Sequence, residues 1–389
     1  MANFHFEKIN SAWDLRNKYE ILWEYLIKEN PSIENFITEN SLESTLPISD
    51  ELNNYTDKDS LRPSGSRRAF YIRLKPKGVL AIKGTEIFHP NLKNELVLDA
   101  KKKLVHRPWT KFENFIYREQ KVPLAILYNE ALEENILAAN FQSKILDRFG
   151  SLELAPTPLF VYKFSKKIKY DYYKLISSFY SNRALNICKP FIDNYGLGAS
   201  IYYYPELPYR IRFCLPTKND SYQIRNLNIA QNGELMSFDP YNASRKLIKI
   251  TAKMLAVGFM PFSNQDYGIG QCIAPQNVTL SGGIADMGSL HDINEISSEK
   301  EFYELFLSMI VMLTNTIKEL MIKPKNDMHY EFEEPSLISS LLIKFIWDKL
   351  LKDLYEFSKK DNISFDPKLK KFLSDDIDLN INNIISKIY

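Results

Sequence analysis

The stretch from Ser244 to Leu290 constrains the fold of this chain more than any other. Apolar residues recur at three- and four-residue steps over 247–257, which predicts an amphipathic helix with Ser244 as its N-cap. Gly258 follows directly and predicts the end of that helix. After an irregular loop, two short apolar runs flank the turn Ser281-Gly282-Gly283. This pattern predicts a tight hairpin.

Two oxygen-bearing side chains lie on either side of this turn, Asn277 before it and Asp286 after it. A hairpin would bring the amide and the carboxylate to one point. Such oxygens, completed by substrate phosphates, are the ligands that Mg²⁺ takes beside a nucleotide. The tripeptide Asp286-Met287-Gly288 has the shape of the metal-binding D-F-G element of protein kinases, although Asp-x-Gly is also a common turn. The sequence therefore predicts a magnesium site formed by Asn277 and Asp286.

Composition narrows the class of protein. The chain has 389 residues, enough for two domains, and 45% hydrophobic with 25% charged residues is typical of a globular protein. A net charge of +2 predicts no nucleic-acid partner. The three cysteines show neither CxxC spacing nor a disulfide framework, and the most apolar run, 305–313, is too short to cross a bilayer. We expect a cytoplasmic protein without a membrane span; the oligomeric state stays open.

A second region of interest surrounds Lys83. The turn Ser64-Gly65-Ser66 leads into one strand, and Val79–Lys83 reads as the next strand of a hairpin. Such a hairpin can lay backbone N–H groups and cations along a polyphosphate, whereas the simpler interpretation of the tripeptide is an ordinary β-turn. Lys83 ends an apolar strand, and buried lysines are rare unless they are paired.

The partner of Lys83 is expected on an amphipathic helix over 124–141. That helix carries Glu130, Glu133 and Glu134, and a carboxylate from it would reproduce the strand-lysine to helix-glutamate pair that positions phosphates in kinases. In the simplest interpretation, Glu133 and Glu134 lie on the solvent-exposed face of this helix. The residues expected to point inward are apolar: Leu127, Ala131, Ile136 and Leu137.

Together these segments resemble the protein-kinase-like fold of the selenoprotein O (YdiU) family. That family has a G-D-G-R-A turn, a strand ending L-K-G-S, an R-E-Y-L helix, an A-V-G-F run and an N-T-D-N-M-S-I-L-G-L-T-I-D-Y-G motif. Similar segments occur here in the same order, over roughly residues 60–290, with no gap between Asn277 and Asp286. They are Ser64–Ala69, Ala81–Thr85, Asn129–Leu132, Ala256–Phe259 and Ala274–Gly288.

The resemblance implies an enzyme that binds ATP and Mg²⁺ (or Mn²⁺). Family members bind ATP inverted relative to ordinary kinases and transfer AMP to protein hydroxyls, whereas the wider fold transfers the γ-phosphoryl group. By resemblance, Lys83 would bind phosphate, and Glu130, with Glu134 as the alternative, would hold Lys83. Gly65 and Arg68 would contact the nucleotide, and Asn277 and Asp286 would hold the metal, with Asp286 and Lys83 as catalytic residues.

Two departures from the family concern the general base. The acidic residue before the metal asparagine is Gln276 here, and the position five residues before Asn277 is Cys272. Neither can act as a base in the way that a carboxylate does. Asp266, in an insertion over 260–270, could replace the missing carboxylate as a catalytic residue, or could simply form a turn.

The expected architecture is α+β, a two-lobed protein-kinase-like fold with a small antiparallel sheet and one key helix in the first lobe. We predict a helical N-terminal extension over 1–60, the smaller lobe over 61–165, and a mainly helical larger lobe over 166–389. Helices are predicted over 302–321, 337–357 and 377–388 of that larger lobe.

Three functions remain open from the sequence. The first is a transferase that moves AMP or phosphate from ATP onto a protein or small-molecule acceptor. The second is a pseudokinase that binds nucleotide or a partner without turnover and acts as a scaffold or regulator, which Gln276 favours. The third is an unrelated α+β interaction protein.

Overall fold

The computed structural model describes most of the 389 residues in two compact units. The first unit contains the described residues within 1–139 and 157–207, and the second contains those within 140–156 and 208–389. The described ranges are 4–49, 69–88, 122, 125–179, 182–208, 210–211, 239–261, 272–275, 277–288, 290–321, 335–360 and 363–374.

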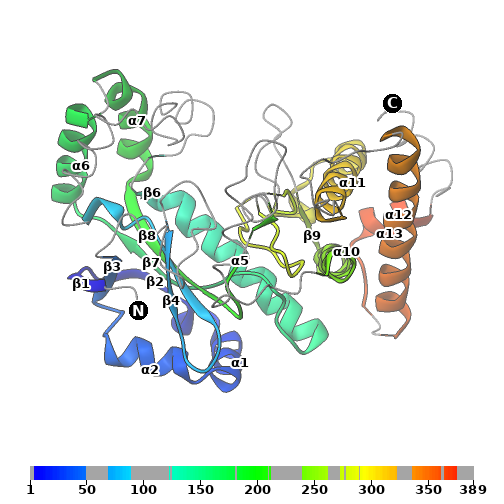
Figure 1. The fold of residues 1–389 in the computed structure, drawn as a ribbon, viewed down its shortest axis with the longest axis horizontal. Coiled ribbons are helices and arrows are strands. Elements are labelled where there is room, and N and C mark those ends of the chain that lie inside the picture. Colours follow the sequence, from blue (N-terminus) through cyan, green and yellow to red (C-terminus); the bar gives the residue numbers. More distant parts are fainter. Residues whose placement is uncertain are drawn as a thin grey trace, which may run out of the picture. The chain divides into compact units, whose positions relative to one another are not determined.

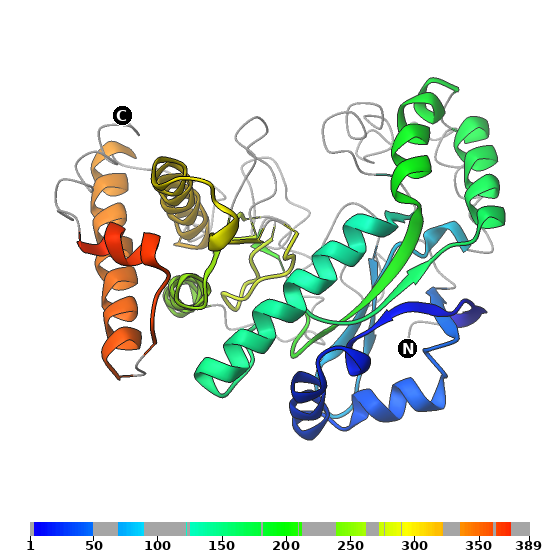
Figure 2. The ribbon, with the colours of Figure 1, turned by 180° about the vertical axis from the view of Figure 1, so that it is seen from behind.

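An antiparallel sheet forms the centre of the first unit (Figures 1 and 2). Its strands run in the order β2 (Ser11–Asp14), β7 (Thr157–Lys163), β8 (Leu197–Tyr204), β5 (Val79–Lys83) and β4 (Ala69–Arg73), with β6 (Ile126–Leu127) also paired to β8. Every residue of β8, a central strand of the sheet, is buried, so side chains on both of its faces are covered. The strands predicted from the apolar run at 79–83 and from the hairpin before it are confirmed.

The sequence predicted a helical extension over residues 1–60, but the described part of that segment, residues 4–49, forms strands as well as helices. Two helices are present, α1 (Glu20–Glu29) and α2 (Ser32–Glu39), but β2 forms an edge of the main sheet, and β1 (Phe4–Lys8) pairs with β3 (Thr45–Ser49). The segment therefore belongs to the first unit. Trp13 and Leu15, both buried, lie at the end of β2 and in a 3₁₀ turn (Leu15–Asn17).

Helix α5 (Tyr128–Phe149) is the long helix that follows the lysine strand, and its first half packs on the sheet (Figure 1). Asn135, which is fully buried, donates hydrogen bonds from Nδ2 to the Ser200 and Tyr202 hydroxyls of β8, at 3.2 and 2.7 Å. The predicted inward position of Ala131 is correct, whereas Ile136 is 37% exposed. Ile136 follows Asn135 directly, so the turn of the helix carries it off the face that meets the sheet.

The first unit extends beyond its predicted limit at residue 165. Helices α6 (Lys166–Phe179) and α7 (Asn182–Tyr195) follow β7, pack against each other and lead back into β8. Because β8 pairs with both β7 and β5, the chain must complete it before leaving the sheet, and the unit therefore continues to Leu207.

The second unit is mainly helical (Figure 2). Helices α10 (Pro240–Ala256), α11 (Glu299–Met321) and α12 (Pro335–Lys360) pack against one another, and α13 (Pro367–Ser374) packs on α11. A short antiparallel pair, β9 (Phe259–Pro261) with β10 (Leu290–Asp292), lies beside α10. The aromatic core of the helices includes Phe306, Trp347 and Phe372. The helices predicted at 302–321 and 337–357 are confirmed; the one at 377–388 lies outside the described residues.

Helix α10 begins earlier than predicted. Asp239 is its N-cap and accepts hydrogen bonds from the Tyr241 and Asn242 amides, at 3.0 Å each, while Pro240 opens the first turn. Ser244 is therefore inside the helix, where its hydroxyl donates to the Pro240 carbonyl. The predicted end at Gly258 is correct, since Gly258 adopts φ +86° there.

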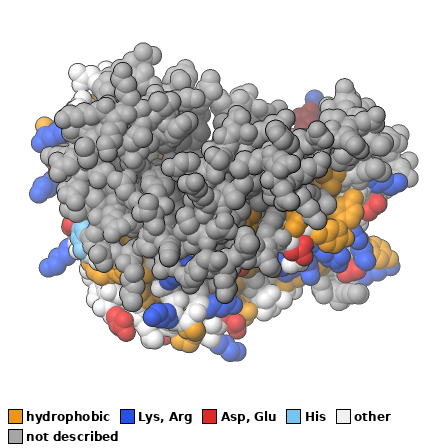
Figure 3. Space-filling view, viewed as in Figure 1, with side chains coloured by type: hydrophobic (Ala, Val, Ile, Leu, Met, Phe, Trp, Pro, Cys, Tyr) orange, Lys and Arg blue, Asp and Glu red, His pale blue; other side chains and the backbone are white. Residues whose placement is uncertain are grey.

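Among the helices that the structure describes, none is both long and apolar enough to cross a membrane. Figure 3 shows Lys and Arg side chains interspersed with Asp and Glu over the described part of one face.

Candidate functional site

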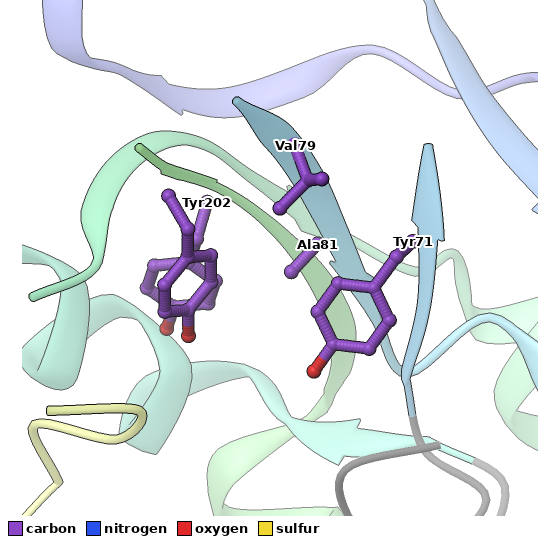
Figure 4. Close-up of a cluster of buried hydrophobic side chains, with 5 residues drawn as sticks. Tyr71, Val79, Ala81 and Tyr202 are labelled. Atoms are coloured by element: carbon purple, nitrogen blue, oxygen red, sulfur yellow. The ribbon is translucent and has the colours of Figure 1, made fainter. Parts of the chain in front are cut away.

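One face of the sheet in the first unit carries Lys83 next to a row of tyrosines. In the register of β4, β5 and β8, Ala81 pairs with Tyr71 on one side and with Tyr202 on the other. Figure 4 shows Tyr71, Ala81, Val79 and Tyr202 projecting from the same face. Lys83 lies two residues beyond Ala81 on its strand, so it belongs to this face as well. The result is a row of buried side chains, called the tyrosine face below, with Lys83 at one end.

Lys83 forms its ion pair with Glu134. The Nζ atom lies 3.6 Å from Glu134 Oε1, and the two side chains are only 14% and 22% exposed. The ammonium group also lies 4.6 Å from the centre of the Tyr202 ring, within the range of a cation–π contact. The expectation that the strand lysine is paired with a glutamate of the following helix is confirmed.

The glutamate that lies 3.6 Å from Lys83 is Glu134, which the sequence analysis gave as the alternative to Glu130. Glu130 is exposed one turn earlier in α5, and Glu133 is exposed too, whereas Glu134 is half-buried. Residues four apart on a helix share a face, so sequence spacing alone did not separate Glu130 from Glu134. The role of Glu130 as a nucleotide-site residue stays a prediction.

Gly84 is required by the close packing behind Lys83. It adopts φ +86°, and a Cβ atom at this position would lie 2.8 Å from the Gly198 carbonyl oxygen and 3.0 Å from Ile126 Cγ1. Only glycine combines this conformation with so close a backbone approach. The Lys-Gly pair in the sequence is thus a structural unit, because the glycine lets β5 end against β8.

The second unit contains the predicted hairpin around Ser281-Gly282-Gly283. Val278 and Ile284 form an antiparallel bridge, and the Ala285 amide donates to the Asn277 carbonyl at 2.6 Å. Gly282 has φ +82°, and a Cβ atom there would lie 2.2 Å from the Ala243 carbonyl oxygen of α10.

A single guanidinium group, that of Arg210, contacts both residues that were predicted to hold a metal. Arg210 Nη1 donates to Asn277 Oδ1 at 3.2 Å, and Nη2 lies 3.8 Å from Asp286 Oδ2. Nη2 also donates to the Ala285 carbonyl at 3.4 Å. Asn277 and Asp286 therefore come to one point, as the sequence predicted. The group that both of them face is the guanidinium of Arg210.

The arrangement does not fit a divalent metal between Asn277 and Asp286. A magnesium ion needs carboxylate and amide oxygens at about 2.0–2.1 Å. Here those oxygens face the guanidinium of Arg210, which is 8% exposed as a residue. The other oxygen of Asp286, Oδ1, accepts from the Gly288 amide at 3.3 Å. An ion bound to the same oxygens would lie beside a fixed positive charge.

Of the other residues considered for the site, the structure describes Cys272. Cys272 is fully buried, and burial, together with the nearby charge of Asp286, raises the pKa of its thiol well above the ordinary value. It therefore cannot act as a base near neutral pH. Gly65, Arg68, Asp266 and Gln276 lie outside the described residues.

Sequence reasoning missed two functional-site residues, Arg210 and Asn135. Arg210 lies 67 positions from Asn277, and nothing in its immediate sequence distinguishes it from a surface arginine. Asn135 follows Glu134 directly and was not considered in the sequence analysis. The only signal for Asn135 was its position one turn after Ala131, on the inward stripe of the helix.

No family model matches the chain, and no curated protein sequence matches it either. The structure itself defines an α+β protein, with a small antiparallel sheet in one unit and a helical second unit.

Proposed function

We propose that the chain is a nucleotide-binding protein of two-lobed, protein-kinase-like architecture, and that it transfers AMP or phosphate from ATP to a protein or small-molecule acceptor. The observation that carries the proposal is the ion pair between Lys83 and Glu134, 3.6 Å apart at one end of the tyrosine face. A lysine on a strand held by a glutamate of the next helix is the device with which kinases position phosphates.

The chemistry of the sheet face supports this proposal. Aromatic and small apolar side chains, here Tyr71, Ala81 and Tyr202, suit the flat surface of a base, and the ammonium group of Lys83 suits a phosphate. Glu134 would hold that ammonium group in place. Asn135 fixes the Tyr202 hydroxyl and so sets the ring over which Lys83 lies. Each of these residues belongs to the first unit.

Nucleotide binding is tested with a matched pair of lysine variants. Lys83→Met removes the ammonium group, and Lys77→Met removes an exposed one from the turn between β4 and β5. Isothermal titration with ATP, with and without Mg²⁺ or Mn²⁺, should show binding to the wild type and to Lys77→Met. Affinity should fall at least about tenfold in Lys83→Met, the loss expected for a charged phosphate contact.

Two results would contradict nucleotide binding by this face. One is the absence of any heat or thermal shift with ATP, AMP or ADP under all metal conditions. The other is equal ATP affinity in Lys83→Met and Lys77→Met. Transfer is measured separately, with ATP labelled at the α- or the γ-phosphate, followed by mass spectrometry of the protein and of added lysate.

A second function, that of a nucleotide-binding pseudokinase, is favoured by the hairpin of the second unit. Arg210 faces the two residues expected to hold magnesium, and the thiol of Cys272 has a raised pKa in a buried environment. Both features suit a scaffold or regulator better than a catalyst. This function predicts ATP binding that depends on Lys83 and no labelled product from either form of ATP. Label in any product would rule it out.

A further inference from the structure

We propose that Arg210 is the resident cation of the Asn277–Asp286 hairpin, so that this hairpin takes up no divalent ion unless the guanidinium is removed. The inference rests on the proposed function in one respect: Asn277 and Asp286 are the two residues expected to hold the metal of a nucleotide-dependent enzyme. The exchange of one cation for another can, however, be measured without nucleotide.

Arg210 contacts the same kinds of oxygen atoms that a bound metal ion would contact. The guanidinium group reaches one amide oxygen, one carboxylate and one backbone carbonyl: Asn277 Oδ1 at 3.2 Å, Asp286 Oδ2 at 3.8 Å and the Ala285 carbonyl at 3.4 Å. These are oxygen ligands of the kinds that hard cations take. The guanidinium presents five N–H donors in a rigid planar fork, which can serve several such acceptors at once.

The backbone holds Arg210 in this position. Arg210 forms an antiparallel bridge with Thr279 of the hairpin, and the Ile211 amide donates to the Val278 carbonyl at 2.8 Å. The Arg210 side chain is 10% exposed and that of Asp286 is 29% exposed. The arginine is therefore built into the hairpin and does not reach it from a surface position.

Charge decides between Arg210 and a metal ion. A divalent cation on the same oxygens would sit about 4 Å from the guanidinium, and even at the dielectric constant of water this repulsion lowers metal affinity about 30-fold. Burial strengthens the repulsion, because there is less water to screen it. Removing the guanidinium while keeping the aliphatic volume should therefore open the hairpin to a divalent ion.

The test is a titration with Mn²⁺ alone, in which the electron paramagnetic resonance signal of free Mn²⁺ falls as the ion binds. The variants are Arg210→Met, Asp286→Asn and their combination, with Arg245→Met as a control that removes an exposed arginine of α10. Arg210→Met should bind Mn²⁺ at least about tenfold more tightly than the wild type. The gain should vanish in the double variant and be absent in Arg245→Met.

Two comparisons keep the inference falsifiable. Mn²⁺ binding to the wild type that is lost in Asp286→Asn would overturn it, because the hairpin would then already hold a metal beside Arg210. A folded Arg210→Met protein without any gain in Mn²⁺ binding would also overturn it. Where Arg210→Met does not fold, equal Mn²⁺ binding by wild type and Asp286→Asn supports the inference by itself. Since no nucleotide is present, none of these results depends on whether Lys83 binds ATP.

Discussion

Replacing Glu134 with glutamine should destabilise the first unit more than replacing Glu130 with glutamine does. Both changes remove one negative charge from α5 and preserve the shape of the side chain. Glu134 Oε1 lies 3.6 Å from Lys83 Nζ, whereas Glu130 is exposed. The comparison therefore measures how much more the half-buried carboxylate beside Lys83 contributes than an exposed carboxylate of the same helix.

The expected size follows from the distance and the exposure. Two unit charges 3.6 Å apart attract by about 5 kcal/mol at an effective dielectric constant of about 20. Most of that is offset by the hydration that the two groups lose, and side chains that are 14% and 22% exposed keep part of their water. We expect a net coupling of about 1–2 kcal/mol between Lys83 and Glu134, and less than about 0.5 kcal/mol for Glu130→Gln.

A double-mutant cycle measures this coupling. The four proteins are the wild type, Lys83→Met, Glu134→Gln and the combination, with Glu130→Gln as the matched control. Native-state hydrogen exchange, read by mass spectrometry on peptides from 79–83 and 128–139, gives the opening free energy of the first unit without a contribution from the second. The reasoning is refuted if the coupling is below about 0.3 kcal/mol, or if Glu130→Gln costs as much as Glu134→Gln.

Three further predictions concern stability. Gly282→Ala should lower the free energy of unfolding by about 3 kcal/mol or more, because its Cβ would lie 2.2 Å from the Ala243 carbonyl at φ +82°; a change within 1 kcal/mol in urea titration would contradict this. Hydrogen bonds from Lys189, Lys169 and Tyr173 lower the pKa of Asp193, so its stabilisation is present above about pH 4 and is lost as pH falls through the lowered folded value. The melting temperatures of wild type and Asp193→Asn should therefore converge on acidification, and a constant difference would be the wrong outcome. Burial lowers the pKa of the His291 imidazole, so the folded protein keeps its full stability above about pH 6.5 and loses stability as the pH falls below that value. The melting temperature of the wild type should therefore fall relative to that of His291→Gln between pH 7 and pH 5. Parallel curves of melting temperature against pH for the two proteins would contradict this.

Local signals in the sequence were sufficient for the element that carries Lys83 in the first unit and for the hairpin that carries Asp286 in the second. The strand ending at Lys83 has a continuous apolar run, and the hairpin near Asp286 has a two-glycine turn. Gly258 ends α10 with a positive φ angle, as its place after an amphipathic run predicted. Such signals are local because they follow from the conformational freedom of glycine and from side-chain periodicity.

Contacts between distant segments decided the rest. The choice of Glu134 over Glu130 depends on how α5 is rotated against β5, and two glutamates one turn apart share a face of the helix before it packs. The place of the first fifty residues was likewise set by strand pairing: β2 joins the sheet through β7, more than 140 positions later.

The sequence by itself determined that Asn277 and Asp286 would meet at a hairpin, because a glycine turn flanked by apolar residues leaves the chain few other conformations. Only the tertiary structure decided which cation they face. Arg210 comes from a segment 67 residues before Asn277, and it reaches the hairpin through backbone pairing that no local pattern encodes. Charge complementarity acts through space, so the identity of the partner depends on the fold that brings the two segments together.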